Sequence, residues 1–347
     1  MNSRARTYGL TTSAAAILAM FALATSASAG PTGPTAGPTE ATSWAAAKKK
    51  STTKSAKLPA VKLTADGAYR YKGRGYVLPR TRLVIRGRVK ADIADQKIKI
   101  EIFRSGKVVK SRTVEIDEAG SISKFHLSWR TGKKGRYTAK VELTDVQKTL
   151  VDDGKGTRVA VVRTNIRSGS RGVAVRLFQN RLRSLHYVSP LNGRFDAATG
   201  RAFIAFRKVN GMSRVASAGS SVARKLAAGK GGFRLRYPGA GRHIEVSIGK
   251  QVMVMADKGR VSRIYHVSTG APATPTIRGT YRVYRKDPGT NAKGMVKSSY
   301  FIRGYAIHGY ASVPTYNASH GCVRVPVPSA SSIFRWVRMG TRVDTYY

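Results

Sequence analysis

Residues 244–267 read IEVSIGKQVMVMADKGRVSRIYHV, in which three runs rich in apolar residues are separated by two short turn-forming segments. In Ile244–Ile248, apolar residues alternate with polar ones, and this period of two is typical of a half-buried β-strand. Gly249-Lys250 and Asp257-Lys258-Gly259 have the composition of tight turns, which join neighbouring antiparallel strands. The pattern therefore predicts an antiparallel meander at the start of a β-rich domain that spans residues 233–347.

The N-terminus has the three parts of a secretory signal peptide. Arg4 and Arg6 precede a mostly small and apolar segment at 9–25, and Ala27-Ser28-Ala29 fits the small-residue rule for a cleavage site. We therefore predict a signal peptide at residues 1–29 and a secreted protein that works outside the cytoplasm, in the cell wall or a periplasm-like space. A signal anchor that stays attached is the alternative.

Two further segments differ in composition. Residues 30–57 are rich in Pro, Thr and Lys and have no apolar period, which predicts a disordered tether. Residues 58–165 contain short alternating runs, such as Ile98-Lys99-Ile100-Glu101-Ile102, with turn residues between them. Such a pattern predicts an all-β spacer that resembles an immunoglobulin-like β-sandwich.

Residues 166–232 change to a helical period. Asp196 can cap a second helix and Gly211 can end it, while Ser221–Ala228 predicts a short third helix. The fold class is therefore multidomain and mainly β, with a small three-helix module before a C-terminal domain of strands. The apolar residues that fall on one face of the first helix are Ala174, Leu177, Phe178, Leu182 and Leu185.

The chain is strongly basic. Its 347 residues include 63 Lys and Arg against 17 Asp and Glu, a formal net charge of +46. Inside a cell such a charge would indicate nucleic acid, but for a secreted protein we expect anionic wall polymers and no nucleic acid as partners. The single cysteine excludes an internal disulfide and a multi-cysteine metal site. We expect no cofactor, no metal and a monomer.

That cysteine, Cys322, has three possible roles: an inert buried thiol, a metal ligand together with His308 and His320, or a nucleophile. A nucleophilic thiol is favoured by nearby positive charge, which Arg324 supplies, and by an imidazole base, for which His308 or His320 is available. Gly321 lets the backbone approach a developing oxyanion. Acids are scarce in this domain, so a neutral acceptor, such as a backbone carbonyl or a hydroxyl, would have to orient the base.

Two strings carry a resemblance to a known family. Ala306-Ile307-His308-Gly309, followed by Ser319-His320-Gly321-Cys322-Val323-Arg324, resembles the signature of the L,D-transpeptidase catalytic domain of the YkuD type, over roughly residues 241–346. Gly172–Leu182, with the turn at Asn192–Asp196, resembles a peptidoglycan-binding helical module. The resemblance implies a C-terminal β-sandwich of mixed sheets.

The resemblance also implies roles for single residues. Cys322 would be the acylated nucleophile and His308 its base, and Arg324 would meet a carboxylate of the substrate. The residues that would shape the site and its oxyanion hole are Ser319, His320 and Gly321.

The function implied is that of a cysteine-dependent acyltransferase of the aminoacyl-transferring class. It would form 3→3 peptidoglycan cross-links through a thioester on Cys322, with peptidoglycan stem peptides and glycan as partners and a role in cell-wall organization and cell shape. Hydrolysis of the same thioester would make the protein an L,D-carboxypeptidase. A wall-binding protein without catalysis is the other alternative.

Overall fold

The computed structural model describes residues 61–89, 97–116, 121–144, 148–150 and 156–347. The predicted signal peptide, 1–29, and the predicted tether, 30–57, lie outside the described residues. Those described all fall within one compact unit, Ala56–Tyr347. Among them, no helix is long and apolar enough to cross a membrane.

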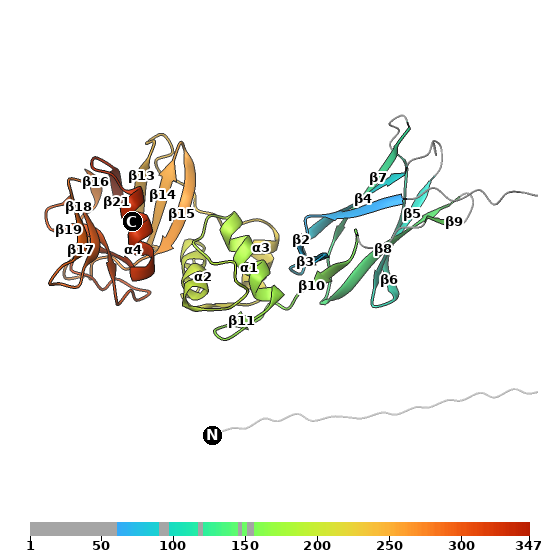
Figure 1. The fold of residues 1–347 in the computed structure, drawn as a ribbon, viewed down its shortest axis with the longest axis horizontal. Helices are drawn as coiled ribbons and strands as arrows, with labels where there is room; N and C mark the ends of the chain where they lie inside the picture. The colour runs from blue at the N-terminus through green and yellow to red at the C-terminus, as the bar shows by residue number, and fades with distance from the viewer. Residues whose placement is uncertain (1–60, 90–96, 117–120, 145–147, 151–155) are drawn as a thin grey trace, which may run out of the picture. The chain divides into compact units, whose positions relative to one another are not determined.

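The N-terminal part of the described chain forms two β-sheets around one apolar core (Figure 1). Ile98, Ile100 and Ile102 are buried in that core, so the predicted alternation is correct. One sheet has the order β1-β4-β7, made of β1 (Val61–Asp66), β4 (Arg82–Val89) and β7 (Ser123–Arg130). The other has the order β2-β3-β10-β8-β5-β6, with β9 beside β8. Its strands are β2 (Tyr69–Tyr71), β3 (Arg74–Val77), β5 (Ile98–Arg104), β6 (Lys107–Val114), β8 (Gly135–Leu143), β9 (Lys148–Leu150) and β10 (Val159–Val161).

A helical segment follows. The Asp196 side chain accepts a hydrogen bond from the Thr199 N–H at 2.8 Å, which is the cap expected at the start of the second helix. The third helix begins and ends one residue before the predicted bounds, because Gly219 rather than Ser220 takes the N-cap position. The elements are β11 (Ile166–Arg167), α1 (Val173–Ser184), α2 (Ala197–Val209), β12 (Ser217–Ala218) and α3 (Ser220–Ala227).

The C-terminal part contains two mixed sheets. β13 (His243–Ser247), β14 (Val252–Asp257) and β15 (Arg260–His266) form the expected antiparallel meander, and Lys258 and Gly259, both at positive φ, make its second turn. This sheet has the order β15-β14-β13-β21-β16, with β16 (Gly279–Arg282) and β21 (Arg342–Tyr346). The other has the order β17-β18-β19-β20, made of β17 (Arg285–Thr290), β18 (Val296–Ile302), β19 (Tyr305–Tyr310) and β20 (Val323–Pro326).

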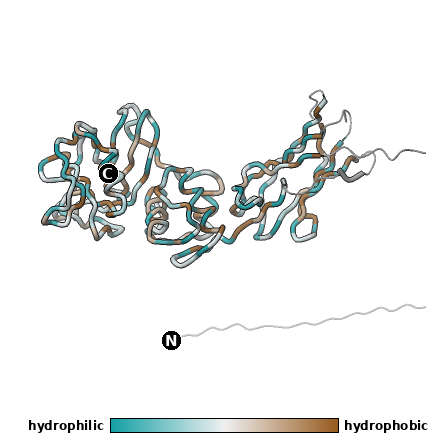
Figure 2. The backbone as a smooth tube through the Cα atoms, in the orientation of Figure 1, coloured by the Kyte–Doolittle hydropathy of each residue, from teal (hydrophilic) through white to brown (hydrophobic). Residues whose placement is uncertain are grey.

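Both sheets of this part are mixed because each contains one parallel pair, β13 with β21 and β19 with β20. Apolar side chains from the two sheets and from helix α4 (Val327–Trp336) form one core. Hydrophobic and hydrophilic stretches are interspersed along the described chain (Figure 2). The mainly β, multidomain class is therefore confirmed, whereas the predicted domain boundaries and the immunoglobulin-like character of the first sandwich stay predictions.

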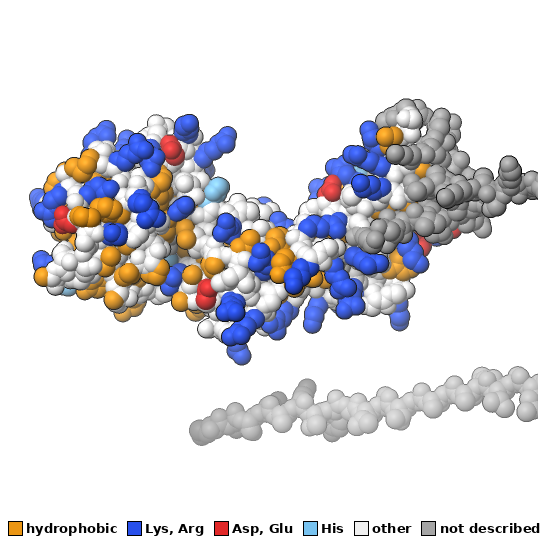
Figure 3. Space-filling view, in the orientation of Figure 1, with side chains coloured by type: hydrophobic (Ala, Val, Ile, Leu, Met, Phe, Trp, Pro, Cys, Tyr) orange, Lys and Arg blue, Asp and Glu red, His pale blue; other side chains and the backbone are white. Residues whose placement is uncertain are grey.

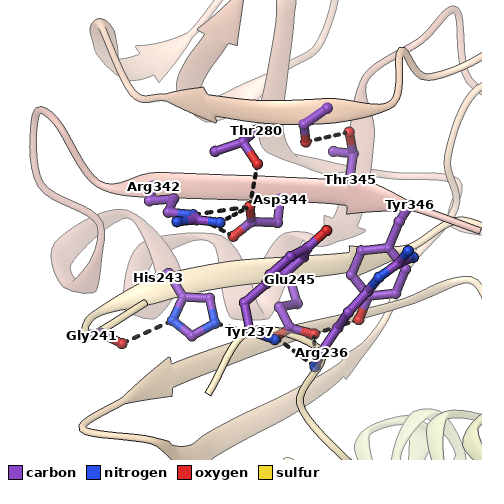
Figure 4. Close-up of polar contacts among 11 residues, drawn as sticks. Arg236, Tyr237, Gly241, His243, Glu245, Thr280, Arg342, Asp344, Thr345 and Tyr346 are labelled. Atoms are coloured by element: carbon purple, nitrogen blue, oxygen red, sulfur yellow. Dashed lines mark hydrogen bonds and ion pairs between the residues drawn. The ribbon is translucent and has the colours of Figure 1, made fainter. Parts of the chain in front are cut away.

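Two buried carboxylates brace the sheet where β13 lies beside β21 (Figure 4). Glu245 accepts hydrogen bonds from the Tyr237 N–H at 2.8 Å and from the Tyr346 hydroxyl, and His243 Nε2 lies 3.3 Å away. Asp344, its register partner on β21, accepts from the Thr280 hydroxyl at 2.7 Å. These bonds join the C-terminal strand to the start of the domain, and neither acid lines the cavity that contains Cys322.

Candidate active site

The candidate residues come together on two neighbouring parallel strands. In the register of β19 and β20, His308 lies opposite Arg324. Cys322 directly precedes β20, two residues before Arg324, and side chains two residues apart along a strand point to the same face. The side chains of His308, Cys322 and Arg324 all line one cavity of about 560 Å³.

The cavity is positively charged. Lys293 and Arg324 line it, and no Asp or Glu is found in its lining among the described residues. The Arg324 guanidinium stacks over the Tyr310 ring, 4.2 Å from the ring centre, and this contact fixes its direction. A carboxylate-bearing ligand therefore meets two cations there without a competing acid. The rest of the lining is Met295, Gly304, Tyr305, His308, Ser319, His320 and Cys322.

His308 is buried, with 3% of its surface exposed, and is held in one orientation. Its Nδ1 lies 3.0 Å from the carbonyl oxygen of Gly309. A carbonyl can only accept, so Nδ1 carries the hydrogen and Nε2 keeps a free lone pair. The orienting group is a backbone carbonyl, one of the neutral acceptors expected from the scarcity of acids.

The charge state of His308 suits a base. Burial lowers the pKa of His308, the hydrogen bond to the Gly309 carbonyl raises it, and the Arg324 charge lowers it further, with a net shift below the ordinary value. The imidazole is therefore neutral near pH 7 and able to accept a proton. His320, in contrast, is exposed and makes no side-chain hydrogen bond to the described residues, so the structure favours His308 over His320 as the oriented histidine.

The Cys322 thiol is half-buried. The Ala306 N–H donates to its Sγ at 3.4 Å, and Sγ lies 3.7 Å from the Gly304 carbonyl oxygen. Burial raises the pKa of Cys322, and the Ala306 N–H with the charges of Arg324 and of Lys293 offsets this only in part. Desolvation thus outweighs the basic surroundings that favour a thiolate, so the thiol needs a base at the moment of reaction.

Hydroxyl groups hold the carbonyls of the motif. Thr274 Oγ1 donates to the Ser319 carbonyl at 3.0 Å, and Thr276 Oγ1 donates to the Gly321 carbonyl at 2.8 Å. Ser319 Oγ donates to the Cys322 carbonyl at 2.6 Å. No acceptor is found among the described residues for the backbone N–H groups of Gly321 and Cys322. These two N–H groups are therefore the candidate oxyanion donors.

Gly321 has a steric reason to be glycine. Its φ is +102°, and a Cβ built there would lie 2.1 Å from Cε1 of the Tyr305 ring. Any side chain at this position would displace either the ring or the backbone next to Cys322. From the sequence, glycine is expected at 321 so that the backbone can approach a developing oxyanion. The structure shows that glycine is also needed there because the backbone passes close to the Tyr305 ring.

Several residues of the site were not found from the sequence. Thr274 and Thr276 lie far from the motif in the chain and carry no local signal. Tyr305 and Tyr310 are on the strand that carries His308, and Tyr310, two residues after His308, could have been found from the period of two. Its ring meets the His308 ring edge-on, with centres 5.6 Å apart.

The structure also bears on the metal alternative. In the part of the chain that it describes, no group of three or more His, Cys, Asp and Glu side chains is placed to hold a metal ion. His308, His320 and Cys322 therefore do not form a metal-binding group.

Comparisons with known proteins agree with this fold and motif. A family model described as the L,D-transpeptidase catalytic domain (YkuD) matches residues 241–344. A crystal structure of an L,D-transpeptidase from Xylanimonas cellulosilytica is 32% identical, with a TM-score of 0.51, over 53% of this chain and 98% of that chain. The chain belongs to the L,D-transpeptidase family, as the resemblance of its motifs implies.

Two other solved structures are similar over different lengths. The NMR structure of the catalytic domain of an L,D-transpeptidase from E. faecium is 26% identical over 30% of this chain and 97% of that chain, with a TM-score of 0.27. An L,D-transpeptidase from Mycobacterium smegmatis is 11% identical over 83% of this chain and 99% of that chain, with a TM-score of 0.28. No curated protein sequence matches the chain.

Proposed function

We propose that this protein is a cysteine-dependent L,D-transpeptidase that forms 3→3 cross-links between peptidoglycan stem peptides. The observation that carries the proposal is the cavity that Cys322, His308 and Arg324 share, in which His308 Nε2 keeps its lone pair because Nδ1–H is bound to the Gly309 carbonyl. A thiol, a neutral oriented base and a cation that meets carboxylates are the parts that acyl transfer from an anionic peptide requires.

The first half of the reaction forms a thioester. His308 Nε2 takes the proton of the Cys322 thiol, and the sulfur attacks the carbonyl carbon of the third stem residue. The N–H groups of Gly321 and Cys322 stabilise the oxyanion. The peptide bond to the D-residue at position four then breaks, and His308 returns the proton to the leaving amine.

The second half transfers the acyl group. The amine of a second stem peptide attacks the thioester, His308 takes its proton, and the thiol of Cys322 is regenerated as the new amide forms. Water in place of the amine would give hydrolysis and an L,D-carboxypeptidase. A thioester reacts readily with amines at neutral pH, so the cross-link forms without a separate energy source outside the cytoplasm.

The charge of the protein fits this setting. Stem peptides carry carboxylates, which Arg324 and Lys293 attract within the cavity. Over the face drawn in Figure 3, Lys and Arg side chains are spread across the described chain rather than gathered in one groove. We also propose secretion, supported by the signal-peptide features of residues 1–29, and general attraction to an anionic wall, supported by the net charge of +46.

The experiment is incubation of the purified protein with tetrapeptide muropeptides and identification of the products by mass spectrometry. We expect cross-linked dimers with the wild type and none with Cys322→Ala or His308→Ala. Release of free D-residue without dimers would instead favour the carboxypeptidase. Equal cross-linking by wild type and Cys322→Ala would remove the nucleophile from the proposal, and no product with any stem peptide would favour a wall-binding protein.

A further inference from the structure

Lys208, on helix α2 of the helical segment, is buried, and no acidic partner for it is found among the residues that the structure describes. Only 3% of its surface is exposed. Its Nζ lies 3.0 Å from the Gln251 carbonyl oxygen, 2.9 Å from the Val267 carbonyl oxygen and 2.8 Å from His266 Nδ1. A lysine is rarely this buried unless its ammonium group is satisfied by hydrogen bonds. His266 is the last residue of β15, Gln251 directly precedes β14 and Val267 directly follows β15, so Lys208 reaches out of its own segment.

The hydrogen count around Lys208 fixes where the protons lie. His266 Nε2 lies 2.9 Å from the carbonyl oxygen of Val313, which can only accept, so Nε2 carries a hydrogen. Burial lowers the pKa of His266 to about 3, and the charge of Lys208 lowers it too, so the ring is neutral and its Nδ1 is an acceptor. Lys208 then faces three acceptors, which match the three N–H donors of an ammonium group.

Burial works against that ammonium. Burial and the charge of Arg214 lower the pKa of Lys208, whereas the three acceptors around its Nζ favour the ammonium form, and Arg201 and Arg214 are the other cations that act on His266. A neutral amine has two hydrogens for three acceptors. It could keep all three contacts only if the ring moved its hydrogen to Nδ1 and donated it to the amine lone pair, and Val313 would then lose its donor. Only the ammonium form of Lys208 therefore satisfies all three acceptors while His266 donates to Val313.

Val313 lies in the loop of residues 311–318, which joins the strand of His308 to the motif of Cys322. The helical segment reaches this loop a second time, since Arg214 donates from Nη1 to the Thr315 carbonyl at 2.6 Å and from Nη2 to the Gly249 carbonyl at 3.0 Å. Lys208 also holds Val267, the neighbour of Ser268, and the Arg324 N–H donates to the Ser268 carbonyl at 2.9 Å.

Shared packing makes this arrangement rigid. The apolar side chains of α1, α2 and α3 form one core with Val254 of β14 and Ile264 of β15. Helix α2 is thus seated on the sheet, and its polar contacts to the loop are made from a fixed base. A flexible attachment between the two parts would not hold Lys208 against three acceptors at once.

We propose that Lys208 is a positioning residue of the active site, which fixes the 311–318 loop through His266 and so sets the geometry between His308 and Cys322. The inference rests on the proposed function of that site. It gives the helical segment a part in catalysis that is separate from any binding of glycan, because the segment holds the 311–318 loop in place through Lys208 with His266 and through Arg214.

The test compares five variants of the full chain: Lys208→Met, His266→Leu, His266→Gln, Arg207→Met, and the double variant Lys208→Met with His266→Leu. Arg207 is the matched control, because it is a buried cation next to Lys208 whose bonds stay within the helical segment, to the carbonyls of Ser217 and Ser213. His266→Gln keeps an N–H that can reach the Val313 carbonyl, whereas His266→Leu does not. Steady-state cross-linking and amide hydrogen exchange of residues 311–318 are measured for each.

We expect Lys208→Met and His266→Leu to lower kcat by roughly 10- to 100-fold with KM changed by no more than about twofold, and to speed exchange in the loop. His266→Gln should recover most of the wild-type kcat, and Arg207→Met should keep both the wild-type kcat and the wild-type loop exchange. The double variant Lys208→Met with His266→Leu should lower kcat no more than Lys208→Met alone, because both changes break the same contact. Wild-type kcat and loop exchange in folded Lys208→Met would overturn the inference, as would an equal loss in Arg207→Met. An inactive wild type would count against the proposed function instead, and amide exchange of residues 311–318 would still test whether Lys208 and His266 hold the loop.

Discussion

Replacement of Gly321 by alanine tests how tightly the motif is packed. The φ of +102° is one that residues with a Cβ rarely adopt, and an alanine Cβ would lie 2.1 Å from the Tyr305 ring. The strained backbone costs about 1–2 kcal/mol and overpacking against the ring adds about 1–3 kcal/mol. We therefore expect Gly321→Ala to lower the free energy of unfolding by about 2–5 kcal/mol.

The loss of activity should exceed what unfolding alone explains. Gly321 directly precedes Cys322, so a backbone shift there moves the sulfur and the candidate oxyanion donors together. A displacement of about 1 Å at a reacting centre can cost roughly 100-fold in rate. Cross-linking measured well below the unfolding transition should therefore fall by about that factor in Gly321→Ala.

A second variant separates the two causes. In a chain that already carries Tyr305→Ala, the ring is absent, and Gly321→Ala should cost only the backbone part, about 1–2 kcal/mol by urea unfolding. Tyr305→Ala alone is the control. If Gly321→Ala unfolds with the same free energy as the wild type and keeps its rate, the steric reasoning is wrong. An equal cost with and without the Tyr305 ring would show that the clash contributes nothing.

The other predictions concern the base, the nucleophile and the buried acid. Because the pKa of His308 is lowered, kcat/KM should be constant near pH 7 and should fall only as pH drops through that pKa, below about 6.5. A pH–rate profile whose acid limb lies above pH 7 would contradict this. A carbapenem should acylate Cys322, as the family resemblance implies; intact-mass measurement should show one adduct on the wild type and none on Cys322→Ser. Burial raises the pKa of Glu245, but hydrogen bonds, chiefly from His243 and Tyr346, bring that pKa below the ordinary value. The ionised Glu245 therefore stabilises the fold above about pH 4, and this stabilisation is lost as pH falls through the lowered pKa. Glu245→Gln should therefore cost about 1–3 kcal/mol in thermal or urea unfolding at pH 7, a difference that shrinks in acid, and an unchanged difference at pH 3 would refute the assignment.

Local patterns in the sequence predicted the elements well. The period of two predicted strands at Ile98–Ile102 and at Ile244–Ile248, and both exist, but the second is buried on both faces rather than half-buried, since Glu245 and Ser247 are buried too. Asp196 caps the helix expected after it. Such patterns reflect which side of a strand or helix is buried and which backbone groups need a cap, so they are written in neighbouring residues. The motif around Cys322 is equally local, and it led to the family.

Helix α4 and strand β21 show what neighbouring residues do not contain. The helix carries Val327, Ala330 and Ile333 at helical spacing, which could have indicated it, but the parallel pairing of β21 with β13 joins the two ends of the domain without a local signal. A pairing between strands so distant in the chain depends on the whole sheet, because each strand edge could accept more than one partner.

The same division holds within the site. The roles of His308, Cys322 and Arg324 could be inferred from the sequence, but the protonation of the thiol could not. The pKa of Cys322 is raised by burial, which depends on the sheets packed around it, more than it is lowered by the cations that the sequence shows. The contact of Lys208 with His266 likewise exists only because α2 is seated on β15. Periodicity records burial one residue at a time, but proton positions and hydrogen-bond partners are set by atoms that folding brings together from far along the chain.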